Sequence, residues 1–187
     1  MARCLLPPLI LLPRARSLLP RVHTLHFDRM ALGIGDRLPS FSLEDQNGDL
    51  RTPASVQGRW LVLFFYPKDD TPGCTAEACS FRDNTESFAA LDAEVWGISG
   101  DDAVSHRRFA TRHNLKFPLL CDRNNALRRE MGVPKALGLL PGRVTYIVDG
   151  EGVIRHTFSN LLDGPAHVRE AQQVLKVCRI TPSPSTM

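Results

Sequence analysis

The sequence predicts a three-layer α/β domain with a central mixed sheet, and three observations lead to this fold class. Trp60-Leu-Val-Leu-Phe-Phe-Tyr66 is a continuous apolar run, which is typical of a strand buried on both faces. Helical patterns alternate with further strand-like runs downstream of it. The chain has 187 residues, enough for one compact domain of roughly 150 residues and a short appendage.

The elements follow in order along the chain. Asn47-Gly48 lies between short extended segments and predicts an N-terminal β-hairpin. After the strand at 60–66, a helix is expected from Cys74, because Ala78, Phe81, Phe88 and Leu91 recur at helical spacing. A strand is then expected at Glu94–Ser99, followed by a helix from an Asp101 or Asp102 cap to about Asn114. A strand near Phe117–Cys121, a short helix around Asn125–Met131 and a loop from Pro134 to Gly142 come next. The last expected elements are an antiparallel strand pair at Arg143–Val148 and Val153–Phe158 and a helix from about Pro165 to Val177. A βαβ core followed by a β-hairpin and a helix is the order of the thioredoxin fold.

The charge of the chain divides it into a leader and a body. Residues 1–29 carry five arginines and one acid, a net +4, whereas the remaining chain carries −1. The body therefore has no excess of basic residues that would indicate nucleic-acid binding. The Arg-rich, Leu-rich leader is expected to be an organellar transit peptide, with a secretory signal or a disordered tail as alternatives. Its apolar run Cys4–Leu12 is too short for a membrane helix, which needs about 20 residues.

These boundaries give three segments. Residues 1–29 form the targeting segment, 30–178 the folded domain, and 179–187 a polar, Pro-rich tail that is expected to be disordered. Five cysteines occur without the regular spacing of a disulfide scaffold: Cys4, Cys74, Cys79, Cys121 and Cys178.

Cys74 has the most informative surroundings. A buried strand ends at Tyr66, Pro67 interrupts it, and a turn rich in Asp, Pro and Gly leads into the helix. Cys74 then falls in or just before the first helical turn, where unpaired backbone N–H groups and the positive helix end stabilise an anion. Such a position favours a reactive thiolate. Position alone leaves a simple buried cysteine equally open.

The stretch around Cys74 resembles a known family. Pro67-Lys-Asp-Asp-Thr71-Pro-Gly-Cys74 matches the peroxiredoxin pattern Pro-x-x-x-Thr-x-x-Cys. The wider segment 66–83 is similar to the peroxiredoxin Q subfamily, also called bacterioferritin comigratory protein. Further similar stretches are Gly97-Ile-Ser-Gly-Asp-Asp102, Gly132-Val-Pro134 and Leu140-Pro-Gly-Arg143, the last of which resembles the plant-type, plastid members. The resemblance covers roughly residues 33–177.

This resemblance implies a role for each matched residue. Cys74 would be the peroxidatic cysteine, which attacks the peroxide and becomes a sulfenic acid. Thr71 would hydrogen-bond the thiolate and the peroxide, Pro67 would shield the sulfur, and Arg143 would stabilise the thiolate and polarise the peroxide. As a strand-start residue, Arg143 can reach a neighbouring strand's carboxyl end. Cys79 would be the resolving cysteine of an intramolecular disulfide.

The resemblance also implies the activity and its context. The expected protein is a thiol-dependent peroxidase for hydrogen peroxide and organic hydroperoxides, acting in antioxidant defence without a metal or another cofactor. Thioredoxin, or glutaredoxin in its place, is the expected reductant. A monomer in the chloroplast is expected, with the mitochondrion as the alternative location. The rival interpretation is a peroxide-sensing relay or chaperone that uses the same cysteine.

The spacing of Cys74 and Cys79 adds a physical constraint. Five residues along an α-helix give a rise of about 7.5 Å and a rotation of about 140°. The two Cα atoms would then lie beyond the roughly 7 Å limit for a disulfide. We therefore predict that the start of this helix unwinds when the disulfide forms.

The other reactive residue types match no catalytic pattern. Cys121 and Cys178 are expected to be structural or surface thiols. His106, His113 and His167 are expected on solvent faces with no chemical role. A Cys-x-x-Cys oxidoreductase motif is missing from the sequence, and a zinc site would need a second Cys or His pair that the sequence does not contain.

Overall fold

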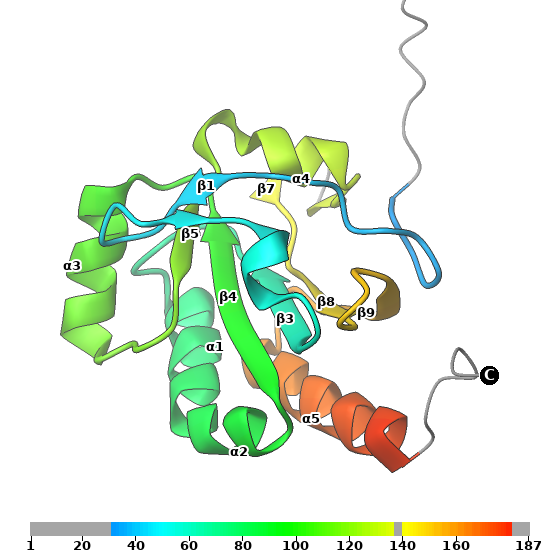
Figure 1. The fold of residues 1–187 in the computed structure, drawn as a ribbon. Coiled ribbons are helices and arrows are strands. Elements are labelled where there is room, and N and C mark those ends of the chain that lie inside the picture. Colours follow the sequence, from blue (N-terminus) through cyan, green and yellow to red (C-terminus); the bar gives the residue numbers. More distant parts are fainter. Residues whose placement is uncertain (1–30, 137–139, 181–187) are drawn as a thin grey trace, which may run out of the picture.

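The computed structural model describes residues 31–136 and 140–180. Its centre is a five-stranded mixed sheet with the strand order β5-β4-β3-β8-β9 (Figure 1). The strands are β3 (Trp60–Phe65), β4 (Ala93–Ser99), β5 (Leu119–Cys121), β8 (Val144–Val148) and β9 (Ile154–Ser159). β3, β4 and β5 run parallel, β8 pairs antiparallel with β3, and β9 pairs antiparallel with β8. The predicted α/β thioredoxin-type order with a mixed sheet is confirmed.

Helices cover one face of the sheet and a thinner layer covers the other. The helices are α1 (Pro72–Asp83), α2 (Thr85–Ala90), α3 (Ala103–His113), α4 (Ala126–Glu130) and α5 (Gly164–Ile180), with short 3₁₀ turns at Pro53–Val56 and Arg123–Asn125. α1, α2, α3 and α5 share one apolar core, and Figure 1 shows α1 and α5 side by side. The 3₁₀ turn at Pro53–Val56, α4 and the segment from Leu32 to Leu43 pack on the opposite face.

The β3 strand explains why both layers hold together. Val62 and Phe64 point into the core beneath the helices, whereas Leu61 and Leu63 point into the core on the other face. Each of these side chains is at most 2% exposed. Burial of this apolar area on both sides is the main favourable term for folding.

The predicted N-terminal hairpin is present. β1 (Leu43–Glu44) pairs antiparallel with β2 (Leu50–Arg51). The turn between them contains Gly48 at a φ of +89°, a backbone region that glycine enters without steric cost.

Two elements differ from the sequence prediction. The single helix expected after Cys74 is broken into α1 and α2 at Asn84, whose φ of −113° and ψ of 12° are not helical. The Asn84 side chain donates to the Ser80 carbonyl oxygen (2.8 Å) and accepts from Gln172 on α5 (2.9 Å), so a tertiary contact fixes the break. The second difference is that the region expected to be a loop contains a short antiparallel pair, β6 (Lys135–Ala136) with β7 (Leu140–Pro141).

The prediction of solvent-facing histidines was wrong for two of the three. His106 and His167 are both 0% exposed. His106 shares the inward face of α3 with Phe109 and Ala110, three and four residues later, and both of those side chains belong to the core. His113 is half-buried.

Some expectations concern residues outside the described part. The predicted targeting segment 1–29 lies there, and so do residues 181–187 of the predicted tail. The prediction that the tail begins at residue 179 was wrong by two residues, because α5 continues to Ile180. Among the residues that the structure describes, no helix combines the length and apolar character that a membrane crossing requires.

Candidate active site

Cys74 lies in the first turn of α1, as predicted. Thr71 precedes the helix in an extended conformation, and Pro72 occupies the first helical position, where its missing N–H costs no hydrogen bond. The first helical hydrogen bond runs from the Thr75 N–H to the Thr71 carbonyl oxygen (2.8 Å). Cys74 is therefore the third helical residue, among the N–H groups that favour an anion. Its side chain is 1% exposed.

Arg143 brings a guanidinium group to the Cys74 thiol. β3 and β8 are antiparallel and Phe65 pairs with Val144, so Arg143 emerges beside the carboxyl end of β3. Its Nη2 lies 3.4 Å from Cys74 Sγ, and its side chain is only 3% exposed. Gly73 permits this approach, because a Cβ atom there would lie 3.2 Å from Nη2. The expected reach of Arg143 across the sheet is therefore found.

Glu77 holds Arg143 from the other side. Its Oε2 forms an ion pair with Arg143 Nη1, and the side chain is fully buried. Burial raises the pKa of Glu77 to about 8, although the attraction of Arg143 acts in the opposite direction. Its second oxygen, Oε1, has no hydrogen-bond partner. This carboxyl group therefore orients the guanidinium while adding less negative charge than an exposed glutamate would.

His167 lies behind Glu77 and stays neutral. Its Nδ1 is 3.7 Å from Glu77 Oε1 and 2.8 Å from the Thr145 hydroxyl oxygen, and its Nε2 is 2.9 Å from the Asn160 carbonyl oxygen. Because a carbonyl oxygen can only accept, Nε2 carries the proton and Nδ1 accepts from Thr145. Burial lowers the pKa of His167 to about 4, against the opposing effect of the Asn160 carbonyl.

A buried acid–base pair fixes the loop before Cys74. The Asp69 carboxylate accepts from the Tyr66 hydroxyl (2.8 Å), from Ser105 (2.8 Å) and from His106 Nδ1 (2.9 Å). His106 Nε2 faces the Leu120 carbonyl oxygen at 3.2 Å. The ring of His106 thus bridges the Asp69 carboxylate on the loop and the Leu120 carbonyl oxygen on β5. Burial acts to raise the pKa of Asp69, but the His106, Tyr66 and Ser105 hydrogen bonds outweigh it and hold that pKa below its ordinary value.

Asp70, the next residue of this loop, is also bound to α3. Asp70 has a φ of 58°, and its carboxylate lies 2.9 Å from Arg112 and 3.6 Å from Arg108 on α3. Asp69 and Asp70 together fasten the strand side of the site to α3.

Thr71 and Pro67 lie at the site with different contacts. The Thr71 hydroxyl donates to the Lys68 carbonyl oxygen (3.1 Å), and the described hydrogen bonds of Cys74 include none from Thr71. The oxygen of Thr71 still has lone pairs with which it can accept. Pro67 is half-buried and lies two residues after the end of β3.

The remaining described cysteines are free thiols in different surroundings. Cys79 is half-buried on α1, one and a half turns after Cys74. Cys121 is buried at the end of β5, and burial raises its pKa to about 11, with Arg123 acting in the opposite direction. Cys178 is half-buried near the end of α5. Burial at Cys121 outweighs the effect of Arg123 and makes an unreactive thiol.

Comparison with known proteins decides the family. Residues 34–157 match the model of the AhpC/TSA family. Chloroplastic peroxiredoxin Q of rice (Oryza sativa subsp. japonica) is 46% identical over 143 residues, which cover 76% of this chain and 66% of the rice protein. The match thus spans just under two thirds of that relative's length. The chain belongs to the AhpC/TSA family, in its peroxiredoxin Q branch.

Solved structures agree with this membership. The structure of peroxidoxin BcpB from Mycobacterium tuberculosis has a TM-score of 0.72 and 34% identity, covering 80% of this chain and 98% of that one. Bacterioferritin comigratory protein of Xanthomonas campestris, described for its alkyl peroxide reduction activity, has a TM-score of 0.68 and 30% identity, covering 73% and 90%. The thioredoxin-type fold is thus shared with other peroxiredoxins.

Several site residues of this peroxiredoxin were missed in the sequence. Glu77 follows Cys74 by three residues, a spacing that places both side chains on one helix face, so its position was readable. Glu77 was nevertheless not assigned to the site, because a glutamate on a helix is usually exposed to solvent. His167 and His106 gave no comparable signal, since their partners come from distant segments.

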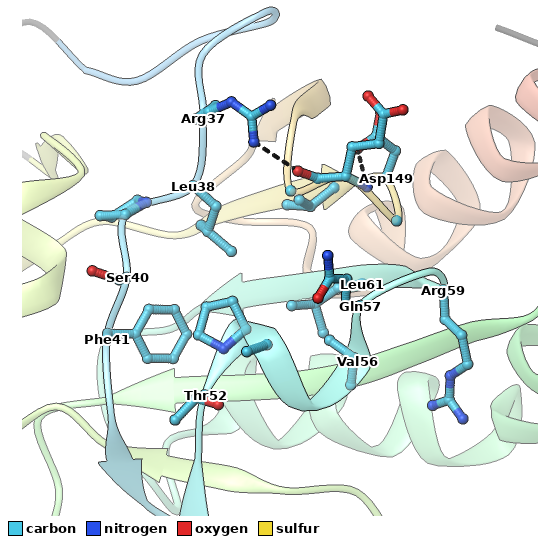
Figure 2. Close-up of a pocket in the computed structure, with 17 residues that line it drawn as sticks. Arg37, Leu38, Ser40, Phe41, Thr52, Val56, Gln57, Arg59, Leu61 and Asp149 are labelled. Atoms are coloured by element: carbon cyan, nitrogen blue, oxygen red, sulfur yellow. Dashed lines mark hydrogen bonds between the residues drawn. The ribbon is translucent and has the colours of Figure 1, made fainter. Parts of the chain in front are cut away.

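A hollow of about 430 Å³ lies at the opposite end of the sheet (Figure 2). Leu61 from the start of β3 and Val148 from the end of β8 line it, together with Phe41 and Val56. Arg37 reaches across to the Glu151 carbonyl oxygen (3.0 Å). No cysteine lines this hollow, so it is separate from the thiol chemistry. Among the described residues, no three His, Cys, Asp or Glu side chains gather into a set that could hold a metal ion.

Proposed function

We propose that this chain is a thiol-dependent peroxidase that reduces hydrogen peroxide and organic hydroperoxides through Cys74. The observation that carries the proposal is the 3.4 Å contact between Arg143 Nη2 and the sulfur of a cysteine in the first turn of a helix. A guanidinium at this distance stabilises a thiolate and can bind the oxygens of a peroxide. Membership of the AhpC/TSA family supports the same activity.

In the first step, the Cys74 thiolate attacks one peroxide oxygen. A sulfur–oxygen bond forms and the oxygen–oxygen bond breaks, giving a Cys74 sulfenic acid and an alkoxide or hydroxide that takes up a proton. Negative charge moves from sulfur to the leaving oxygen, and Arg143, held by Glu77, is placed to stabilise it. Thr71 is proposed to accept a hydrogen bond from the peroxide, and Pro67 to limit access of water to the sulfur.

In the second step, the Cys79 thiol attacks the sulfenic acid and releases water, giving a Cys74–Cys79 disulfide. Both residues lie within the continuous helix α1, so the first one and a half turns must unwind. Glu77 lies between the two cysteines, so unwinding also withdraws it from Arg143. A dithiol reductant then restores both thiols, and we propose thioredoxin, with glutaredoxin as the alternative.

We further propose that the protein works as a monomer in the plastid. The location is supported by relatives such as the rice protein, which is named as chloroplastic. Residues 1–29 are proposed to be the transit peptide. Import of a reporter fused to these residues into isolated chloroplasts, with mitochondria in parallel, tests the location, and gel filtration with light scattering tests the monomer.

Turnover of peroxide with a thioredoxin system is the decisive test of the activity. Wild-type protein should consume many equivalents of peroxide, and Cys74→Ser should consume none while remaining folded. Cys79→Ser should complete one oxidation and then stop. A single stoichiometric oxidation of the wild type would instead indicate a sensor or chaperone.

Hydrogen exchange of residues 74–82 tests the unwinding. The disulfide form should exchange much faster in this segment than the reduced form. Equal protection in the two forms would refute the proposed helix opening.

A further inference from the structure

The hydrogen-bonded pairing of β3 with β8 ends one residue before the residues of the candidate site. Phe65 pairs with Val144 as the last pair of the ladder. The next two residues, Tyr66 and Arg143, therefore lie beyond the ladder, and Pro67 follows Tyr66. The sheet alone does not fix the distance between the chain segments that carry Pro67 and Arg143.

Arg128 on α4 spans this open end. Its Nη2 donates to the Tyr66 carbonyl oxygen (2.7 Å) and its Nη1 donates to the Gly142 carbonyl oxygen (2.6 Å). These carbonyls belong to the residues immediately before Pro67 and Arg143. One rigid guanidinium thus holds both peptide groups that precede the proposed site residues.

The charge of Arg128 lies in a dry environment. The side chain is 5% exposed, and its guanidinium carbon lies 5.3 Å above the centre of the Phe65 ring. Within the described residues, Arg128 takes part in no ion pair, and its Nε has no hydrogen-bond partner. Burial lowers the pKa of Arg128, and the Asp122 carboxylate is the largest influence in the opposite direction. A buried cation needs a nearby negative charge, and the buried Asp122 carboxylate, which accepts from the Arg128 backbone N–H (2.9 Å), supplies it.

We propose that Arg128 is a positioning residue for the peroxidase reaction, which holds Pro67 and Arg143 in register and so keeps the Arg143 guanidinium at the Cys74 sulfur. The inference rests on the proposed function of Cys74. The bridge needs two donors in a fixed fork, so a lysine at this position keeps the charge but does not replace the bridge.

Alkylation of Cys74 by iodoacetamide as a function of pH measures, without peroxide, whether Arg143 is still held at the sulfur. In a Cys79→Ser background, Arg128→Met should move the midpoint of the alkylation profile upward by about 1 pH unit, because Arg143 is displaced from the thiolate. Arg128→Lys should also move the midpoint upward, because one ammonium group cannot hold both carbonyls. If the first substitution prevents folding, Arg128→Gln is to be measured in its place with the same expectation.

Peroxide reduction measures the bridging effect. Arg128→Lys should lower the rate constant for peroxide about tenfold at a pH where Cys74 is fully alkylatable, because one ammonium group cannot hold both carbonyls. The adjacent Arg129→Met, which removes an exposed arginine from the same helix, is the matched control and should change neither quantity. An unchanged alkylation midpoint and an unchanged peroxide rate in the folded Arg128 variants would overturn the proposal. Because alkylation needs no turnover, a protein without peroxidase activity would still reveal the displacement of Arg143.

Discussion

Cys74 and Cys121 are both buried thiols near the carboxyl ends of parallel strands, yet their surroundings differ. Cys74 is 1% exposed and Cys121 is 4% exposed. Cys74 follows β3 at a helix start and contacts Arg143, whereas Cys121 ends β5 and burial raises its pKa to about 11. Burial alone therefore suppresses a thiol. Two features favour reactivity at Cys74: its position at a helix N-terminus and its contact with the guanidinium of Arg143, which lies just before β8.

Removing Arg143 should have the largest effect on this difference. Arg143→Met should lower the rate constant of Cys74 with peroxide by about 100- to 1,000-fold, because the developing charge loses its main donor. Stopped-flow measurement of peroxide reduction checks this. Arg123→Met removes the arginine beside Cys121 and should leave the rate unchanged, and a comparable loss in that control would contradict the assignment.

Chemical labelling should separate the two thiols directly. With a pKa of about 11, only about one Cys121 thiol in 10,000 is ionised at pH 7. Since both side chains are similarly shielded, iodoacetamide should modify Cys74 at least about 100-fold faster. Mass spectrometry of the two peptides over time measures the ratio. Equal rates would mean that the contact with Arg143 does not distinguish the two sites.

His167, the buried histidine behind Glu77 and Cys74, should also respond to acid. The folded pKa of His167 is about 4, below the ordinary value near 6.5. The unfolded chain therefore binds a proton between pH 6.5 and 4 that the folded chain does not bind. This proton uptake lowers the free energy of unfolding as the pH falls, by up to about 3 kcal/mol.

His167→Gln removes this titration. Between pH 6.5 and 4, the wild type should therefore lose up to about 3 kcal/mol more free energy of unfolding than the variant. Urea unfolding of both proteins at several pH values measures this. His113→Gln, at a half-buried histidine of α3, serves as the control. If the wild-type and His167→Gln curves stay parallel from pH 6.5 to 4, His167 is not held neutral.

The smallest effect is expected at Cys121 itself. Cys121→Ala should reduce the free energy of unfolding by about 1 kcal/mol, because a small buried group is removed, and should leave peroxide turnover unchanged. Thermal unfolding and the turnover assay measure the two quantities. A loss of turnover without a loss of stability would give Cys121 a role that its surroundings do not suggest.

Local patterns were sufficient to predict much of this fold. The apolar run at 60–66, the Asn47-Gly48 turn and the helix start at Cys74 depend on neighbouring residues only, and all three were found. Asp102 caps α3 as one of two predicted candidates, with its side chain accepting from the Ser105 N–H. The break at Asn84 escaped prediction because its partner, Gln172, lies on α5.

The site was predictable where the motif is contiguous and much less so elsewhere. Cys74, Thr71 and Pro67 share one segment, and Arg143 was reached through the family resemblance. His106, His167 and Arg128 received no functional prediction, because their environments are created by strands and helices far away in sequence. A polar residue on a helix is expected to face water, and only the folded chain supplies the buried partners that reverse this expectation.

The two ends of the active-site segment are anchored very differently. The residues before Cys74 are fastened to α3 through Asp69 and Asp70, while the helix after it must open in the proposed cycle. After each reduction, only the first one and a half turns of α1 must therefore refold, while the loop before Cys74 stays attached to α3. Helical turns of this length form within about a microsecond. Refolding should therefore not limit the proposed cycle, and the thiol exchange steps and the supply of reductant should determine its rate.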